Sequence, residues 1–418
     1  MRITMMAIGS TGDVYPYTIL GGELRRRGHD VTIAAFSHFE KAVKDAGLRF
    51  FPLPGDASRF VDSLMQPELN VFNYLPNLEK EILPYAGPLL EAMTASCADA
   101  EGLVSTFFGS VPLTVAEKYG IPFVQTHYYP MDANSEAPIP VTPQLPVGGK
   151  AGYNQLTYHV AYLLLGLVER RLLNGWRSEQ GMSHRSLRPE AYFTLNGAPV
   201  PELYAISPLV FPRPECWESN ITMTGFWREP PRDDRTLPES LRAFLDAGDP
   251  PVYIGFGSMG SGDMGKTLRT VLDALSRTHL RAILARGWSG ADAGKMPHNV
   301  YYAEGFLSHD TLFPRCCAVV HHGGAGTTAA GLYAGCPTLV IPFGGDQPFW
   351  GGRIAALRLG PKPLRRNALS AERLTHALAE LTGTPEYRSN AAALAAGLRN
   401  EHGVQTAADR IEAAFLKK

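Results

Sequence analysis

The sequence predicts an α/β protein made of two doubly wound domains, each built on a parallel sheet. Short apolar runs alternate with helix-like segments, which is typical of parallel sheets covered by helices. This alternation occurs twice, on either side of a charged segment that contains two prolines. The chain of 418 residues is also long for a single hydrophobic core.

The first series of elements fills residues 1–232, which we expect to form the N-terminal domain. Strands are expected at 3–8, 31–36, 102–107 and 122–126, with a helix at 20–27 that ends on Gly28. Residues 132–149 are rich in proline and lack periodicity, which indicates a loop. Residues 153–181 look helical, and their apolar face either packs on the domain or walls a lipophilic pocket. That face carries Tyr158, Tyr162, Leu163, Leu164, Leu167, Leu172 and Leu173.

The second series fills residues 233–400, which we expect to form the C-terminal domain. Its strands are expected at 251–256, 280–285, 300–303, 318–321 and 338–342. Between the two series, residues 228–235 are charged and have no apolar period, so they are interpreted as a linker with the boundary near residue 232. The last segment, 401–418, is expected to contain a helix.

Composition excludes several classes of function. A net charge of −1 with 19% charged residues argues against a nucleic-acid partner. Five cysteines without Cys-x-x-Cys spacing indicate neither a disulfide framework nor a zinc site, and they favour a reducing compartment. The first apolar run is too short for a signal peptide, and the longest, 160–168, is too short to span a membrane. We therefore expect a cytoplasmic protein without a transmembrane segment.

The most informative motif is His-His-Gly-Gly-Ala-Gly-Thr-Thr at 321–328, which directly follows an apolar strand. A helix that begins on a glycine-rich turn presents unpaired N–H groups and a partial positive charge, which suits a diphosphate. The alternative is that the glycines only permit tight strand-to-helix packing. The candidate anion ligands are His322, Gly324, Gly326, Thr327 and Thr328.

Two further turns carry candidate polar groups. Asp346 and Gln347 follow the next apolar strand, where open α/β sheets bind their ligands, and together they can accept from and donate to sugar hydroxyls. Gly9-Ser10-Thr11-Gly12-Asp13 follows the first strand but lacks the Gly-x-Gly-x-x-Gly spacing of dinucleotide sites. Asp13 is therefore either a helix N-cap or a general base.

Taken together, residues 305–313, 322–330 and 342–347 resemble the donor-binding signature of family 1 glycosyltransferases, in particular the sterol and lipid glucosyltransferases. Residues 204–217, 224–227 and 350–353 are similar to the same enzymes. The resemblance implies the GT-B fold, in which two Rossmann-like domains face a central cleft. It also implies that the N-terminal domain binds the acceptor, that the C-terminal domain binds a nucleotide sugar, and that a helix in 401–418 packs back on the N-terminal domain.

The resemblance also implies roles for single residues. Asp13 is expected to deprotonate the acceptor hydroxyl, and His322 and Ser258 to contact the diphosphate. Phe306 and Leu307 are expected near the nucleotide base, and Asp346 and Gln347 at the hexose. The glutamate that holds the ribose in plant members is replaced here by Ala330. The motif therefore leaves UDP and TDP donors open.

Acceptor binding is the weakest part of the resemblance, which fades over about 55–170. Our candidate acceptor contacts are Ser10, Phe107, His127 and Tyr158, with His127 as the alternative base should Asp13 be a cap. Peripheral contact with a membrane stays open. No Asp-x-Asp, the metal-holding pair of the other common glycosyltransferase fold, occurs in the chain. We therefore expect no metal and no cofactor, because helix amides and His322 can stabilise the leaving diphosphate.

The predicted function is that of an inverting, metal-independent hexosyltransferase. It would move glucose from UDP-glucose to a hydroxyl of a lipophilic acceptor such as a sterol, polyketide or phenolic compound. One alternative is a TDP-sugar rhamnosyltransferase that makes a glycolipid. A nucleotide-sugar epimerase and a catalytically silent nucleotide-sugar or lipid binder are further alternatives.

Overall fold

The computed structural model describes residues 1–55, 85–140, 151–186, 188–229, 237–257, 264–285, 296–305 and 307–416. The chain forms two compact units. The N-terminal unit runs to Arg228 and includes the last segment, His402–Lys418, whereas Glu229–Glu401 belong to the C-terminal unit. The expected boundary near residue 232 lies in 230–236, outside the described residues.

The N-terminal unit is built on a seven-stranded parallel sheet with the order β3-β2-β1-β4-β5-β8-β9. The chain moves outward from β1 to β3 and then returns to the other side of β1 with β4, so the strand order reverses beside β1. Loops after the two strands at such a switch point diverge and leave room for a ligand. The strands are β1 (Arg2–Met6), β2 (Asp30–Phe36), β3 (Arg49–Leu53), β4 (Gly102–Thr106), β5 (Phe123–His127), β8 (Glu202–Tyr204) and β9 (Ile221–Met223).

Helices of the N-terminal unit include α1 (Thr11–Arg26), α2 (Glu40–Asp45), α5 (Val111–Tyr119), the long α6 (Ala151–Glu179) and α14 (Gly403–Leu416). The helix expected at 20–27 is only the second half of α1, because Pro16 interrupts the helical pattern of its first half. A short antiparallel hairpin, β6 (Thr194–Leu195) and β7 (Ala198–Pro199), follows the 3-10 turn η2 (Pro189–Tyr192).

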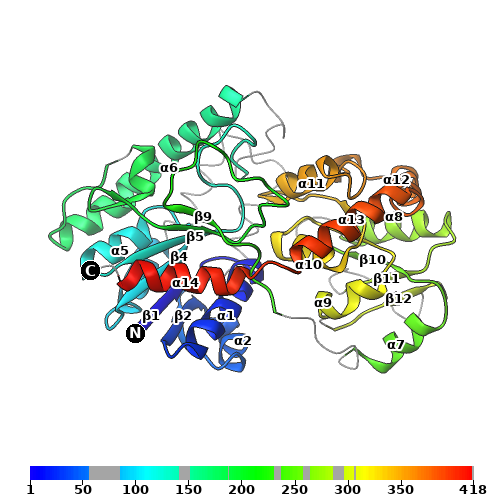
Figure 1. Ribbon diagram of the computed structural model, residues 1–418, viewed down its shortest axis with the longest axis horizontal. Helices are drawn as coiled ribbons and strands as arrows, with labels where there is room; N and C mark the ends of the chain where they lie inside the picture. Colours follow the sequence, from blue (N-terminus) through cyan, green and yellow to red (C-terminus); the bar gives the residue numbers. More distant parts are fainter. Residues whose placement is uncertain are drawn as a thin grey trace. The chain divides into compact units, whose positions relative to one another are not determined.

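The last helix belongs to this unit as well, and α14 lies against α1 and β5 (Figure 1). Arg27, which caps α1, binds Asp409 and Glu412 of α14 at 2.6 and 2.9 Å. His29 bonds the same Glu412 at 2.8 Å. The inner face of α14 is apolar and buried, with Ile411 and Phe415 among its side chains.

The C-terminal unit holds a five-stranded parallel sheet with the order β12-β11-β10-β13-β14. Here the strand order reverses between β10 and β13, which again places a switch point at the centre of the sheet. The strands are β10 (Val252–Gly255), β11 (Ala282–Leu284), β12 (Val300–Tyr302), β13 (Ala318–His321) and β14 (Thr338–Val340). Each matches an expected strand, because parallel strands buried on both faces are continuous apolar runs.

Helices cover both faces of this sheet, and two buried clusters fill the space beneath them. They are α7 (Glu239–Asp246), α8 (Met264–Ser276), α9 (His309–Leu312), α10 (Ala325–Ala334), α11 (Gln347–Ala356), α12 (Ala371–Gly383) and α13 (Pro385–Leu398), with 3-10 turns η5 (Phe313–Arg315) and η6 (Arg366–Ala368). The predicted class, two Rossmann-like α/β domains, is confirmed. No helix in the described part of the chain is both long and apolar enough to cross a membrane.

Candidate active site

The glycine-rich turn after β13 forms the N-terminus of α10, as the motif predicts. Gly324 is the N-cap, so the amides of Ala325, Gly326 and Thr327 are among those that helix geometry leaves without a partner. The amide of Thr328 already donates to the Gly324 carbonyl at 2.9 Å. The expectation that this amide binds an anion was wrong, because the helix uses it for its own first hydrogen bond. The Thr328 hydroxyl is buried and has no hydrogen-bond partner among the described residues.

The His322 ring lies at the same turn, in space that two glycines of the C-terminal unit leave open. A Cβ on Gly324 would come within 2.6 Å of its Nε2, and one on Gly257 within 3.3 Å of its Cε1. Burial lowers the pKa of His322 to about 4, so the imidazole is neutral near pH 7. Its Nδ1 is buried and has no hydrogen-bond partner in the described ranges. The ring is therefore held ready to donate to, or accept from, a ligand.

His321 has a structural role, in contrast to its neighbour. Its Nδ1 accepts the Gly323 amide at 2.9 Å, which fixes the backbone where the strand turns into the helix. Gly323 itself has φ +97°, and a Cβ there would meet the Val340 side chain at 2.6 Å. Only glycine fits this position, which explains the His-His-Gly-Gly sequence in terms of packing.

Asp346 and Gln347 lie beside this turn, because a Cβ on Gly323 would come within 3.1 Å of the Gln347 Cβ. Both side chains already have local partners. Gln347 Oε1 accepts the amides of Phe343 and Gly344 at 2.6 and 3.2 Å, and Asp346 Oδ2 accepts the Trp350 indole N–H at 2.9 Å. The pair is thus held by local hydrogen bonds next to the glycine-rich turn, and Gln347 has only its Nε2 to offer a ligand.

The other donor-site candidates are less informative. Leu307 is buried in the core cluster that also contains Leu312 and Phe313. Contact with a nucleotide base is therefore not evident from its position. Ala330 is buried in the same cluster, so its side chain points into the core. Ser258 and Phe306 lie outside the described residues.

In the N-terminal unit, Ser10 and Asp13 form a capping box at the start of α1. Ser10 is the N-cap, and its Oγ accepts the Gly12 amide at 3.2 Å. Asp13 Oδ2 accepts the amide and the hydroxyl of Ser10 at 2.7 and 3.1 Å. The N-cap alternative for Asp13 was therefore wrong in detail, because Asp13 occupies the third helical position. A Cβ on Gly9 would come within 2.2 Å of Asp13 Oδ2, so this turn needs glycine.

The environment of Asp13 suits a general base. Burial raises its pKa to about 6 despite the hydrogen bonds from Ser10, so the group is mostly ionised at pH 7 yet holds a proton more tightly than an exposed aspartate. Its Oδ1 accepts no side-chain hydrogen bond from the residues that the structure describes. Tyr128 donates to the Asp13 carbonyl at 3.1 Å, and Tyr128 and Tyr17 both pack on Trp227. Tyr17 and Tyr128 were not singled out from the sequence, whereas Trp227 belongs to the segment 224–227 that carries part of the resemblance.

The predicted acceptor contacts Phe107, His127 and Tyr158 do come together, but inside the unit. Phe107 lies 6.3 Å from His127 and 5.8 Å from Tyr162 between ring centroids. Tyr158 is 1% exposed, and its hydroxyl accepts a hydrogen bond from Asn134 at 2.7 Å. His127 and Tyr158 are both buried among neighbouring side chains, and direct contact of either with an acceptor stays a prediction. Burial also lowers the pKa of His127 to about 4.

Helix α6 has two apolar faces. Tyr158, Tyr162 and Leu173 face the unit, so the first interpretation of this helix, packing on the domain, holds for them. The opposite face is a row of exposed apolar side chains at helical spacing, which we call the α6 stripe. It consists of Tyr153, Leu156, Val160, Leu163 and Leu167, with exposures from 37 to 57%.

Comparison with known proteins agrees with this geometry. Residues 3–138 match the glycosyltransferase family 28 N-terminal domain, and residues 269–413 match the erythromycin biosynthesis protein CIII-like C-terminal domain. Sterol 3-beta-glucosyltransferase UGT80B1 of Arabidopsis thaliana is 34% identical over 98% of this chain and 67% of its own length. The chain belongs to the sterol 3-beta-glucosyltransferase family.

Other members of the family match as well. UGT80A2 of Arabidopsis thaliana is 34% identical over 97% of this chain, and the sterol 3-beta-glucosyltransferase of Pichia angusta is 34% identical over 98%. This family member spans 64% of the length of the former and 33% of the latter.

Solved structures show the same fold as this family member. The glycosyltransferase of kitacinnamycin has a TM-score of 0.73 at 20% identity, covering 99% of this chain and 98% of its own. The calicheamicin glycosyltransferase CalG4 has a TM-score of 0.71 at 18% identity, covering 100 and 99%. VinC, solved in complex with DTDP, has a TM-score of 0.68 at 18% identity and covers 100% of both chains. The predicted GT-B fold is confirmed.

Proposed function

We propose that this protein is an inverting glycosyltransferase that moves glucose from UDP-glucose to a hydroxyl of a lipophilic acceptor such as a sterol, polyketide or phenolic compound. The observation that carries the proposal is the Asp13 carboxyl, whose pKa is raised to about 6 by burial at the switch point of the N-terminal sheet. Family membership and the anion-binding start of α10 in the C-terminal unit support it.

The proposed chemistry is a single displacement. Asp13 Oδ1 takes the proton of the acceptor hydroxyl as the hydroxyl oxygen bonds to the anomeric carbon. The bond from that carbon to the diphosphate oxygen breaks on the opposite side, and its electron pair leaves with the nucleoside diphosphate. The configuration at the anomeric carbon is therefore inverted. Asp13 then releases its proton to solvent.

The leaving diphosphate gains negative charge as it departs. The amides of Ala325, Gly326 and Thr327, the Thr328 hydroxyl and the His322 ring are the donors we assign to it. A neutral His322 can donate from one ring nitrogen, and an approaching diphosphate favours its protonated form. We propose that this set of donors makes a metal ion unnecessary for the transfer step.

The acceptor assignment draws on the α6 stripe. A contiguous exposed apolar surface is costly in water and often marks contact with lipid or a partner. All five side chains of the stripe are apolar, and the exposed Arg170 follows them on the same helix. We propose that the stripe gives peripheral contact with a phospholipid surface, from which a membrane-dissolved acceptor is reached.

The deciding experiment crosses a donor panel with an acceptor panel and detects the products by mass spectrometry. We expect glucoside formation from UDP-glucose with a sterol or other lipophilic alcohol, and a β-anomeric linkage by NMR. Thymidine diphosphate in a related fold, SsfS6, favours testing TDP-sugars as the alternative donors. Donor turnover without acceptor would point to an epimerase, and the absence of all turnover with donor binding intact would point to a silent binder.

A further inference from the structure

The turn after β4 lies at the same switch point as the turn that holds Asp13. Strands β1 and β4 pair in parallel, with Met6 opposite Ser105, so the turns that follow them leave the sheet side by side. We call residues 107–110, which lead from β4 into α5, the β4 turn. A switch point leaves room for a ligand between two such turns. The β4 turn therefore borders the crevice in which we expect the acceptor.

A carboxyl group of helix α6 holds the end of the β4 turn. Glu169 Oε1 accepts the Ser110 amide at 2.9 Å, and Glu169 Oε2 accepts the Ser110 hydroxyl at 2.5 Å. Ser110 is the N-cap of α5, but its side chain makes no capping bond within that helix. The start of α5 is thus fixed by a contact from α6 and not by a local cap.

Gly109 lets this carboxyl group come close to the backbone of the turn. The residue has φ +58°, and a Cβ there would lie 1.6 Å from Glu169 Oε1. Any larger residue would displace the Glu169 side chain. Burial raises the pKa of Glu169 although the bonds from Ser110 favour its charged form, and the Tyr192 hydroxyl bonds the same carboxyl group. Glu169 is therefore committed to this turn and its immediate neighbours.

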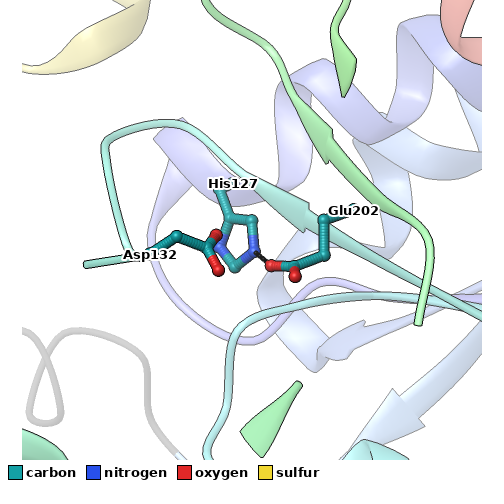
Figure 2. A group of neighbouring side chains, drawn as sticks. All are labelled: His127, Asp132 and Glu202. Atoms are coloured by element: carbon teal, nitrogen blue, oxygen red, sulfur yellow. Dashed lines mark hydrogen bonds and ion pairs between the residues drawn. The ribbon is translucent and has the colours of Figure 1, made fainter. Parts of the chain in front are cut away.

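Aromatic side chains hold the beginning of the β4 turn. The Phe107 ring lies 5.8 Å from the ring of Tyr162, which precedes Glu169 by two turns on the same face of α6. On its other side Phe107 lies 6.3 Å from His127, whose imidazole bonds the Glu202 carboxyl group (Figure 2). Helix α6 thus contacts both ends of the turn, through Tyr162 and through Glu169.

We propose that Glu169 is a positioning residue for the acceptor, because it holds the β4 turn in place beside Asp13. The inference rests on the proposed function, in which Asp13 takes the acceptor proton. Glu169 acts through Gly109 and Ser110 and is not itself assigned a contact with the acceptor. Its loss should therefore weaken acceptor binding and leave nucleotide binding in the C-terminal unit unchanged. The opposite face of the same helix carries the α6 stripe, so one element serves both the proposed membrane contact and the acceptor site.

The test uses dehydroergosterol, a fluorescent sterol, as the acceptor. Glu169→Ala removes both bonds to Ser110, and we expect the KM for the sterol to rise about tenfold, since small misplacements of a binding group are costly. UDP affinity measured by calorimetry should stay within about twofold of the parental value. Glu169→Gln keeps an oxygen that can accept the Ser110 amide, so it should restore most of the lost affinity. An unchanged KM in Glu169→Ala would overturn the proposal.

Asn174→Ala is the matched control for a general loosening of α6. Asn174 is buried on the same helix, and its Oδ1 accepts the Arg185 amide at 3.0 Å instead of a group in the β4 turn. We expect this variant to lower the Tm while keeping the parental KM. An equal rise in KM in the control would contradict a specific role for Glu169. Should Glu169→Ala fail to fold, Ser110→Ala removes one of the two bonds and should give a smaller rise in the same KM.

Sterol binding without a donor separates this inference from the proposed function, because fluorescence reports it in the absence of turnover. If no glucoside forms but sterol affinity falls in Glu169→Ala and not in Asn174→Ala, the proposed transfer is wrong and the positioning role stands. If glucoside forms with the same KM in every variant, the positioning role is wrong and the proposed transfer stands.

Discussion

Asp13 combines two tasks that are usually divided between residues. Its Oδ2 completes the capping box with Ser10, and its Oδ1 is left for a substrate. The sequence singled out the residue because its Gly-Ser-Thr-Gly-Asp turn follows a buried strand, and the family resemblance implied its role as a base. It could not show that Ser10 is the cap, because Ser10 and Asp13 both favour that position.

Asp13→Asn separates base from cap, since an amide oxygen still accepts from Ser10 but takes no proton. We expect the variant to keep its Tm and its UDP affinity while losing roughly a hundred-fold or more in kcat with an aliphatic alcohol. The loss should be smaller with an acidic phenol, which releases its proton more easily. Parental turnover of the alcohol would show that another group is the base.

The raised pKa of Asp13 predicts a pH dependence in two measurements. The base acts when ionised, so kcat/KM should rise with pH through about 6 and level off above it. The free energy of unfolding should change in the opposite direction. The folded state holds the Asp13 proton more tightly than the unfolded state does, and this stabilising contribution is lost as pH rises from about 4 to about 6. Asp13→Asn should lack this loss. An activity profile that is flat between pH 5 and pH 7 would contradict the assignment.

Asp346 is predicted to bind the sugar hydroxyls and not the nucleotide. Asp346→Asn keeps an acceptor for the Trp350 indole, so the turn should stay folded. We expect donor turnover to fall about tenfold or more, as charged hydrogen bonds are worth roughly 1.5–3 kcal/mol, while calorimetry shows little change in UDP affinity. An equal loss of UDP binding would place Asp346 at the nucleotide.

At the scale of elements, the sequence predicted the strands that are buried on both faces, because such strands are continuous apolar runs. The strands of the C-terminal sheet and helix α6 appear at their expected places. The three-residue strands β8 and β9 were missed because they are too short to show a pattern. The contact of His127 with Glu202 was missed for the same reason, since Glu202 lies 75 residues away and reaches His127 only through the pairing of β8 with β5.

The α6 stripe carries the prediction at this scale. Replacing Leu163 and Leu167 by serine removes apolar surface that is already exposed, so the Tm should change little. Cosedimentation with phospholipid vesicles should weaken severalfold, and turnover of a vesicle-dissolved sterol should fall while that of a soluble phenol is kept. Leu209→Ser is the control, because Leu209 is 47% exposed outside α6. Unchanged vesicle binding would exclude the stripe as a membrane contact.

For the whole molecule, the proposed set of diphosphate donors predicts how the transfer reaction responds to metal ions. Transfer should proceed at its full rate without added magnesium or manganese and after brief EDTA treatment, because the diphosphate donors are protein groups. A strict requirement for either ion would contradict the proposed donor set.

The return of α14 to the N-terminal unit makes the C-terminal unit an insertion within another folded body. A protein that ends at Glu401 would therefore still contain every element of the C-terminal sheet, yet would leave the α14-binding surface of α1 and β5 uncovered. Proteolysis that starts at the carboxyl end therefore removes part of the N-terminal unit before it reaches the C-terminal unit. During synthesis, which runs from the amino end, the C-terminal unit can fold before α14 completes the unit that precedes it in sequence.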